Sequence, residues 1–307
     1  MPGSIWLDGR LVDAAGPHLA VTDRGFQLGD GIFETARARR AVVIELDEHL
    51  RRLRESAAAL AIRLPYDDDA LSEAIGMVLT AEGLAANGSL REGPPPGDAA
   101  LRITASRGPV DARGLLPAGV EATEATVVIQ AWPYAPPSAD LLDRGVRSIA
   151  STIRRDPRSP LAGIKSTSRA DHVYARLEAA RAGADEALFL TTDGALSEAT
   201  SANLWVVSGR RLTTPPKSAA ILPGTTRTWL LEHAASIGLE PVEADLAAQD
   251  LLAADEALLS SSVAGIVPLT GYDGRPIGDG RPGPWAQALR AAREDWIDAI
   301  SRAGLPR

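Results

Sequence analysis

The sequence of 307 residues contains no cysteine and very little lysine. Without cysteine, disulfide bonds and thiolate metal sites are excluded. The four histidines are scattered and lack the spacing of metal ligands. No apolar run approaches the roughly 18 residues of a membrane span. No signal peptide is recognisable after Met1 either. These absences predict a protein with no metal site and no membrane partner, located by default in the cytoplasm.

The charge balance is acidic, with 40 Asp and Glu residues against 32 Lys and Arg and a formal net charge of −8. Nucleic acid needs a basic binding face, so the charge argues against nucleic acid as a partner. The hydrophobic fraction of 45% and the charged fraction of 23% are typical of a globular enzyme. The length allows two domains of about 150 residues each.

Lys165 and Lys217 are the only lysines among the basic residues. Arginine is always charged, whereas a partly buried lysine amine can lose its proton and form an imine with an aldehyde. Lys165 follows small and apolar residues, while Lys217 follows two prolines in a sequence typical of an exposed turn. The sequence therefore makes Lys165 a candidate covalent catalyst, with chance survival of the lysine as the alternative.

The hydrophobic pattern predicts an α+β chain in two parts. A Pro-rich linker at residues 132–141 separates a small N-terminal α/β domain, 1–131, from a larger C-terminal domain, 142–307, that is richer in β structure. In the first part, strands are expected at 6–7, 11–12, 32–37, 41–46, 101–105 and 125–132, with a loop at 93–97 and helices starting at an Asp47 cap and at the 67–69 caps. In the second part, strands are expected at 146–153, 187–191, 203–207 and 257–260, with helices at 170–182, 225–237 and 284–303.

Four further features suit a phosphorylated aldehyde cofactor. The segment Leu222 to Arg227 places glycine and threonines at a helix start, where backbone N–H groups and the helix dipole favour an anion. Hydroxyls at 260–262 end an apolar strand, Glu198 precedes another, and Arg52 lies on the first long helix. A carboxylate can hold a proton on a pyridine nitrogen, and arginine binds phosphate. Taken singly, these features also fit an ordinary helix cap, a turn and solvated side chains.

Several motifs together resemble the fold-type IV pyridoxal-phosphate enzymes. This family includes the D-amino-acid and branched-chain aminotransferases and 4-amino-4-deoxychorismate lyase. The motifs occur in the family's order and span nearly the whole chain. They are Phe26 to Arg37, His49 to Leu53, Ala162 to Lys165, Glu198 to Trp205 and Leu222 to Arg227.

The resemblance implies pyridoxal 5'-phosphate as the cofactor, held between a small α/β domain and a larger β-rich pseudo-barrel domain. It implies Lys165 as the Schiff-base lysine and proton shuttle, and Glu198 as the partner of the pyridine nitrogen. It also implies Arg52 as a phosphate-binding residue. The remaining implied cofactor-binding residues are Leu222, Gly224, Thr225, Thr226, Ser261 and Ser262. The family works as homodimers on small amino and keto acids.

The substrate-side residues are the less specific part of the resemblance. Arg37 matches an arginine near the substrate in branched-chain enzymes, and Arg107 and Arg113 lie in a loop that reaches the substrate. Each is a candidate clamp for a carboxylate. Leu28 and Ala170 replace tyrosines of the aminotransferases, which weakens assignment to the branched-chain group.

The resulting hypothesis is an aminotransferase that moves an amino group between an amino acid, with a D-amino acid favoured, and a 2-oxo acid. The alternative is the lyase, which releases pyruvate and 4-aminobenzoate. Substrate handedness stays open between D-amino acids, L-branched-chain amino acids and R-amines. Glycines at 278–283 also fit a dinucleotide motif, which would indicate a nucleotide-dependent oxidoreductase, but no buried parallel strand is expected before them and prolines crowd the segment. A vestigial cofactor site would leave a non-enzymatic binding role.

Overall fold

The computed structural model describes residues 3–16, 18–85, 98–111, 114–116 and 119–303. Contacts divide the chain into two compact units. Unit 1 is Met1–Ala135 with Ile164–Arg169 and Ile297–Arg307, and unit 2 is Pro136–Gly163 with Ala170–Trp296. The domain limits drawn from the sequence remain a prediction, and the units differ from them by placing the segment with Lys165 in unit 1. The loop expected at 93–97 lies outside the described residues.

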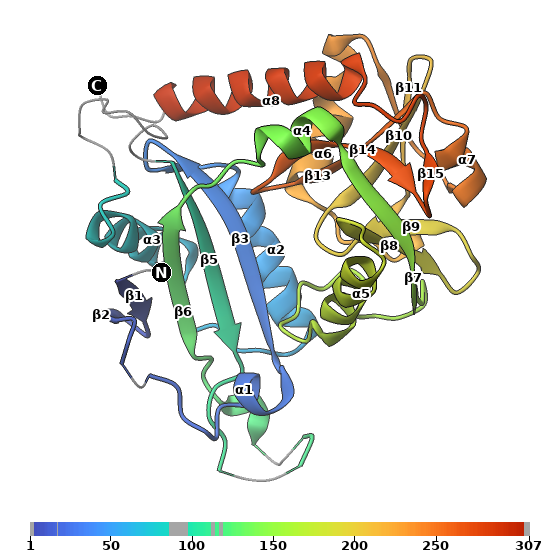
Figure 1. The fold of residues 1–307 in the computed structure, drawn as a ribbon. Helices are drawn as coiled ribbons and strands as arrows, with labels where there is room; N and C mark the ends of the chain where they lie inside the picture. The colour runs from blue at the N-terminus through green and yellow to red at the C-terminus, as the bar shows by residue number, and fades with distance from the viewer. Residues whose placement is uncertain (1–2, 17, 86–97, 112–113, 117–118, 304–307) are drawn as a thin grey trace. The chain divides into compact units, whose positions relative to one another are not determined.

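Unit 1 contains a six-stranded sheet in the order β2-β1-β6-β5-β3-β4, in which every pairing is antiparallel. Two helices, α2 and α3, cover one face of this sheet (Figure 1) and share one apolar core with its strands. The elements are β1 (Ser4–Leu7), β2 (Arg10–Asp13), α1 (Arg24–Leu28), β3 (Gly31–Arg39), β4 (Val42–Val43), α2 (Leu46–Ala59), α3 (Asp68–Ala81), β5 (Ala99–Ser106) and β6 (Val127–Pro133).

Side chains alternate between the two faces of β3, as in any strand. Ile32 and Ala36 belong to the core under the helices, and Glu34 on the same face binds α2. Phe33 and Arg37 therefore point to the opposite face. This second face of the sheet, which α2 and α3 leave open, carries the polar residues described below.

Of the two helix caps expected in unit 1, one is confirmed and the other is wrong. Asp67 caps α3 by accepting a hydrogen bond from the N–H of Ala70, which confirms the expected cap. The expected Asp47 cap of α2 is wrong, because the helix begins at Leu46 after Glu45, which has a left-handed backbone with φ 56° and makes no side-chain cap. The strand expected at 41–46 is also too long, because β4 covers only Val42–Val43 and the helix already begins at Leu46.

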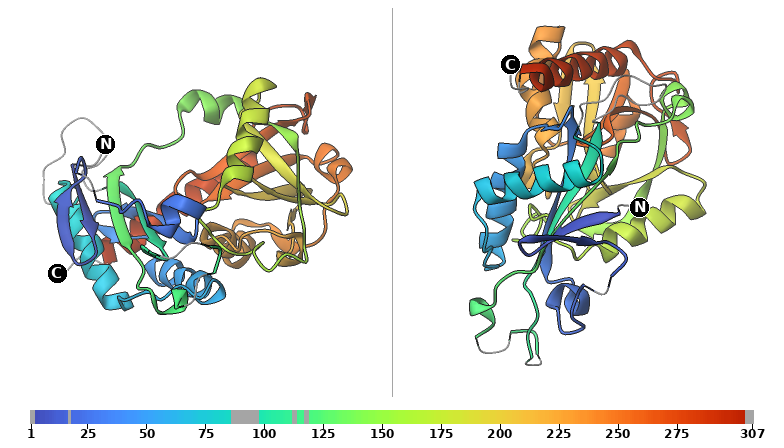
Figure 2. Two further views of the ribbon diagram at one scale, coloured as in Figure 1. Left: turned by 90° about the horizontal axis from the view of Figure 1, so that it is seen from below. Right: turned by 90° about the vertical axis from the view of Figure 1, so that its left-hand side faces the viewer.

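Unit 2 contains a nine-stranded mixed sheet in the order β12-β11-β10-β13-β14-β7-β8-β9, with β15 paired to β14 off this path. The β11–β12, β14–β7 and β7–β8 pairs are parallel. Because β9 also packs against β10, the sheet curls on itself (Figure 2). The strands are β7 (Val146–Arg155), β8 (Glu186–Thr191), β9 (Leu196–Ala199), β10 (Asn203–Ser208), β11 (Arg211–Thr214), β12 (Glu240–Glu243), β13 (Glu256–Ser261), β14 (Gly265–Tyr272) and β15 (Arg275–Pro276).

The helices of the second half complete an α+β architecture, which confirms the expected fold class. Helix α5 packs on β7 and β8, and α6 shares an apolar core around Trp205 with the first turns of α8. Among the described residues, no helix is long and apolar enough to cross a membrane. The helices are α4 (Ala139–Arg144), α5 (Ala170–Arg181), α6 (Thr225–His233), α7 (Ala248–Leu252) and α8 (Pro284–Ala303).

Two Pro- and Gly-rich segments differ from their interpretation in the sequence. Part of the expected linker is helical, because Ser138 caps α4 by accepting a hydrogen bond from the N–H of Leu141. The dinucleotide motif at 278–283 follows β15, an exposed strand of two residues that pairs antiparallel with β14. A dinucleotide site needs a buried parallel strand before its glycines, so that interpretation is wrong.

Candidate active site

Lys165 is fixed by backbone pairing with β3 within unit 1. Its carbonyl accepts a 2.9 Å hydrogen bond from the N–H of Phe33, and the N–H of Thr167 donates to the carbonyl of Gly31 at 2.8 Å. The Nζ atom of Lys165 lies 4.7 Å from the centre of the Phe33 ring. A catalytic amine needs a rigid support, and the edge of β3 supplies one.

Two arginines lie near the same Phe33 ring as Lys165. The guanidinium carbons of Arg102 and Arg169 lie 3.7 and 5.9 Å from the ring centre. Within the described part of the chain, Arg102 makes one hydrogen bond, from Nε to Thr104, and its terminal nitrogens have no acceptor. Burial lowers the pKa of Arg102, with the charge of Glu34 opposing that shift. A partly buried cation without a carboxylate partner favours an anionic ligand.

Sequence reasoning missed Arg102. Its position was visible, since it alternates with the apolar residues Leu101 and Ile103 along β5 and must point away from their core. The sequence does not say that this face also carries Phe33 and Lys165.

Arg52, the expected phosphate arginine, is buried on α2. Its Nε and Nη2 atoms donate to the two carboxylate oxygens of Glu34 at 2.7 Å each, and His49 Nδ1 lies 2.7 Å from Glu34 Oε2. Burial alone would raise the pKa of Glu34, but the hydrogen bonds from Arg52 and His49 outweigh burial and lower it to about 2. The carboxylate therefore aligns Arg52, and the phosphate role of Arg52 stays a prediction.

Arg37, the first candidate substrate clamp, is also buried. Its Nη2 donates to Asp98 at 3.2 Å, and its guanidinium stacks on the ring of Tyr134 with 3.9 Å to the centroid. It lies on the same face of the sheet as Phe33, opposite α2 and α3, and both side chains are buried. Its role toward substrate stays a prediction.

Arg107, the second candidate, uses every guanidinium nitrogen for contacts within the protein. Its Nε and Nη2 bind the carboxylate of Asp30, while Nη1 and Nη2 donate to the carbonyls of Ala61 and Leu60. Burial would raise the pKa of Asp30, but hydrogen bonds from Arg107 and Arg24 lower it overall. A substrate carboxylate would have to displace one of these contacts. Arg113, the third candidate, lies outside the described residues.

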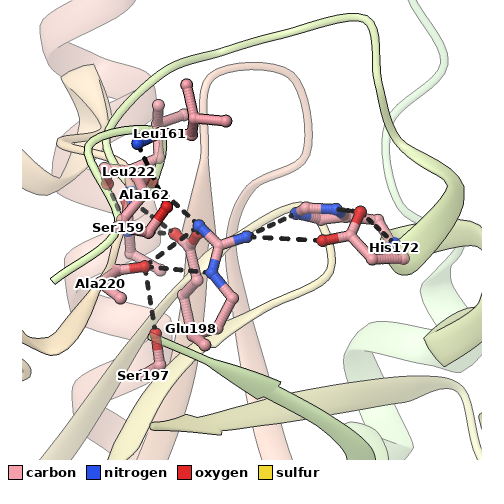
Figure 3. A network of polar contacts seen from close by, with 11 residues as sticks. Ser159, Leu161, Ala162, His172, Ser197, Glu198, Ala220 and Leu222 are labelled. Atoms are coloured by element: carbon pink, nitrogen blue, oxygen red, sulfur yellow. Dashed lines mark hydrogen bonds and ion pairs between the residues drawn. The ribbon is translucent and has the colours of Figure 1, made fainter. Parts of the chain in front are cut away.

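Glu198 lies on β9 in unit 2 and is almost fully buried. Its Oε2 accepts hydrogen bonds from Asn203 Nδ2 at 3.2 Å and from the N–H of Leu222 at 2.9 Å. Arg155 approaches the other oxygen, with Nη2 3.7 Å from Oε1. Figure 3 shows Glu198 and Leu222 within this polar network. These donors stabilise the ionised carboxylate.

Helix α6 begins directly beside this carboxylate. Asn203 Nδ2 donates to the carbonyl of Leu222 at 2.9 Å as well as to Glu198, so one side chain links the turn to β9. Gly224 precedes the helix, and a Cβ on it would lie 2.2 Å from Asn203 Oδ1. Glycine is therefore required for this close approach.

The hydroxyl groups expected to bind phosphate gather at the start of α6. Thr225 Oγ1 and Ser262 Oγ lie 3.1 Å apart, and Thr226 Oγ1 is buried with no hydrogen-bond partner in the described part of the chain. Ser261 instead accepts a hydrogen bond from the N–H of Ala264. A buried hydroxyl without a partner is costly unless a ligand satisfies it.

These residues fit pyridoxal phosphate. The helix start and Thr226 suit its phosphate, and buried Glu198 suits a protonated ring nitrogen. The class is thus that of pyridoxal-phosphate enzymes, and comparison with known proteins gives the family.

The family model of the class IV aminotransferases matches residues 31–272, and the chain belongs to this family. It is 36% identical to a putative branched-chain-amino-acid aminotransferase of Methanocaldococcus jannaschii, over 95% of each chain. It is 30% identical to the D-alanine aminotransferase of Bacillus licheniformis, over 95% of this chain and 96% of the relative.

Solved structures give the same result. A T.th. branched-chain amino acid aminotransferase, solved with pyridoxamine 5'-phosphate, is similar with a TM-score of 0.87 at 27% identity, covering 97% of this chain and 95% of that one. A putative 4-amino-4-deoxychorismate lyase from Legionella pneumophila has a TM-score of 0.79 at 26% identity, covering 92% and 96%. The chain is a pyridoxal-phosphate-dependent aminotransferase with the fold expected from the sequence.

Proposed function

We propose that Lys165 is the residue that bonds to pyridoxal phosphate and carries the proton in transamination between an amino acid and a 2-oxo acid. The main support is the backbone pairing that fixes the Lys165 segment against β3 beside Phe33. When bound, the cofactor acts as the electron sink for the substrate carbanion. The amine of Lys165 would then accept the proton from Cα of the substrate as a general base and deliver it to C4′ of the cofactor as a general acid.

Glu198 would hold a proton on the ring nitrogen of the cofactor. Its carboxylate is buried, and two N–H donors stabilise its charge. The phosphate would be held by the start of α6 and by Arg52. The proposed phosphate-end residues of the α6 region are Leu222, Gly224, Thr225, Thr226, Ser261 and Ser262.

The substrate carboxylate would bind on the face of the unit 1 sheet that α2 and α3 do not cover. Arg102 supports this, because it is partly buried, stacks on Phe33 and makes no ion pair among the described residues. Arg37 lies on the same face. Arg107 and Arg113 remain candidates from the sequence, although Arg107 would first have to release Asp30 or a carbonyl.

Within this activity we propose a D-amino acid as the amino donor. Similarity to a D-alanine aminotransferase supports it, as does the absence of tyrosine at Leu28 and Ala170. An L-branched-chain amino acid is the competing donor, because relatives named for that activity include the one at 36% identity. The lyase is a further alternative, supported by the structural similarity to a putative lyase.

A single-turnover screen separates these candidates. The purified enzyme is mixed with each enantiomer of a set of amino acids, and conversion of the bound cofactor to its aminated form is followed by absorbance. Faster conversion by D-enantiomers is expected. Preference for L-valine or L-leucine would contradict the D-assignment. Formation of 4-aminobenzoate from aminodeoxychorismate, without conversion by any amino acid, would identify the lyase.

The assignment of Lys165 is tested by borohydride reduction, which makes the link between cofactor and amine permanent. Peptide mass spectrometry is expected to find the cofactor mass on Lys165 and not on Lys217. A label on Lys217, or on neither lysine, would contradict the proposal.

We also propose that the enzyme is a homodimer. Large apolar side chains are exposed around α1, and Arg24 ties this helix to the carbonyl of Gly114 in the nearby loop. Exposed apolar clusters often mark protein interfaces. Light scattering is expected to give twice the chain mass, and Phe26→Ser to reduce it, whereas Met77→Ser on α3 should not. The exposed side chains are Leu19, Val21, Phe26, Leu28, Leu115 and Leu116.

A further inference from the structure

Arg155, the last residue of β7, connects three parts of unit 2. Its Nη2 donates to the carbonyls of Ala162 and Ala220 at 2.9 and 3.1 Å and lies 3.7 Å from Oε1 of Glu198. Figure 3 shows Ala162, Ala220 and Glu198 brought together in one polar network. The folding of β7 alone does not account for these contacts, because each one reaches a different part of unit 2.

His172 on α5, which is labelled in Figure 3, contacts Arg155, with Nε2 3.4 Å from Nη1. Arginine can only donate, so Nε2 accepts and Nδ1 carries the hydrogen, which it donates to Asp171 Oδ1 at 2.6 Å. Burial would raise the pKa of Asp171, but its interactions with His172, and with Arg155 nearby, lower it overall. Through these two contacts the imidazole orients the guanidinium.

The two carboxylate oxygens of Glu198 contact different groups. Oε2 receives the N–H of Leu222 and the amide of Asn203, and Arg155 faces Oε1. Arg155 also binds the carbonyl of Ala220, two residues before Leu222. It thus supports both the carboxylate and the turn that donates to that carboxylate.

We propose that Arg155 is a positioning residue of the transamination reaction, which keeps Glu198 ionised and oriented for the cofactor's ring nitrogen. This inference rests on the role of Glu198 proposed above. Arg155 itself touches neither cofactor nor substrate in this proposal and acts only through Glu198.

The charge of Arg155 favours the anionic form of Glu198. In the described part of the chain, the ionisable groups in contact with Arg155 are Glu198 from β9, and Asp171 and His172 from α5. Removing Arg155 should therefore let Glu198 take up a proton at higher pH. A neutral Glu198 would no longer favour a protonated ring nitrogen.

The test compares two ligands of the full-length apoprotein. One is pyridoxamine 5'-phosphate, and the other is its analogue with CH in place of the ring nitrogen. The ratio of their dissociation constants measures the contribution of the ring nitrogen, because effects on the phosphate and on general folding cancel. The ratio is measured at decreasing pH. The midpoint is the pH at which half of the preference for the nitrogen-containing ligand is lost.

In Arg155→Met this midpoint is expected to rise by about one pH unit, a tenfold change in proton affinity. The matched control is Arg154→Met, because Arg154 is the exposed neighbour, and its side chain donates, among the described residues, only to the carbonyl of Ser151. The midpoint of this control should equal that of the wild type. Arg155→Gln, which keeps donors but lacks charge, should shift the midpoint likewise and serves if the Met variant does not fold. The same shift is expected in a His172→Gln background, which removes the titration of the imidazole.

An unchanged midpoint in folded Arg155→Met or Arg155→Gln would overturn the proposal for Arg155. The proposed function fails in a different way. If the wild type shows no preference for the nitrogen-containing ligand, or Glu198→Gln keeps the preference and its acid midpoint, then Glu198 is not the ring-nitrogen partner.

Discussion

Arg52 holds Glu34 with two parallel hydrogen bonds of 2.7 Å beneath the sheet of unit 1. Removing one partner of such a buried pair leaves an uncompensated charge. We expect Glu34→Gln to lower the free energy of unfolding at pH 7 by about 3 kcal/mol, measured by urea denaturation. Glu55→Gln, which removes the exposed partner of Arg51, is the control and should change stability by less than about 0.5 kcal/mol.

The same pair predicts a pH dependence of stability. The pKa of Glu34 is lowered to about 2 in the folded chain from its ordinary value of 4.5, so the unfolded chain binds the proton first. The stability contribution is present above about pH 4.5 and is lost as the pH falls toward 2. The difference between wild type and Glu34→Gln should therefore shrink over this range. A constant difference from pH 7 to pH 2 would contradict the assignment.

Thr226 offers a prediction in which stability and cofactor affinity change in opposite directions. Its buried hydroxyl has no partner in the described part of the chain. Thr226→Val should leave the apoprotein equally stable or more stable, and should weaken cofactor binding about tenfold, the loss of about one charge-assisted hydrogen bond. Thermal melting and cofactor titration measure the two effects. Thr80→Val, at an exposed threonine of α3 in unit 1, is the control and should not weaken cofactor binding.

Gly224 should not tolerate a side chain. An added Cβ would lie 2.2 Å from Asn203 Oδ1, so Gly224→Ala must move Asn203, which binds Glu198. We expect a loss of about 1–3 kcal/mol in stability together with weaker cofactor binding. Gly76→Ala is the control, since nothing lies within 4 Å of its added Cβ on α3 and alanine favours a helix. Normal cofactor affinity in Gly224→Ala would show that the turn adapts.

Arg102 should affect the substrate and not the cofactor. Arg102→Met removes the cation that stacks on Phe33, and we expect KM for the 2-oxo acid to rise about tenfold or more, the contribution of a charged hydrogen bond. Cofactor affinity should not change. Arg10→Met on the exposed strand β2 is the control for loss of one positive charge. An unchanged KM in Arg102→Met would remove this residue from the substrate site.

Lys165 should be essential for the proton transfer. Lys165→Ala is expected to lower the single-turnover rate with an amino acid by about 10²–10⁴-fold, the usual contribution of a general acid–base group. Lys217→Ala provides the matched control, because it is the other lysine of the chain and lies in the turn before α6. A rate within threefold of the wild type in Lys165→Ala, roughly 0.7 kcal/mol in barrier, would exclude the proposed role.

Much of this arrangement could be predicted from local sequence. The rarity of lysine singled out Lys165, and the 3.6-residue period located α2 and α3. The central strand β14 was not predicted; it contains Pro268, which cannot donate to a strand ladder, yet β13 and β7 pair with it on both sides. Whether proline removes a needed hydrogen bond depends on partners far away in the chain.

The contacts of the arginines could not be predicted from the sequence either, because their partners are far away in the chain. Arg107 meets Asp30, 77 residues away, and the strand-like pairing of Lys165 with Phe33 spans more than a hundred residues. Spacing indicates which face of an element a side chain occupies. It does not indicate which other element covers that face, and this decides between a clamp for substrate and a structural ion pair.

Asn203 serves two neighbours at once, because a single amide nitrogen donates to Glu198 and to the carbonyl of Leu222. A disturbance at either neighbour is therefore passed to the other. We expect combined substitutions at Glu198 and Gly224 to cost less than the sum of the single ones. Because both depend on Asn203, changes at Glu198 and in the turn at Leu222 are expected to occur together during evolution.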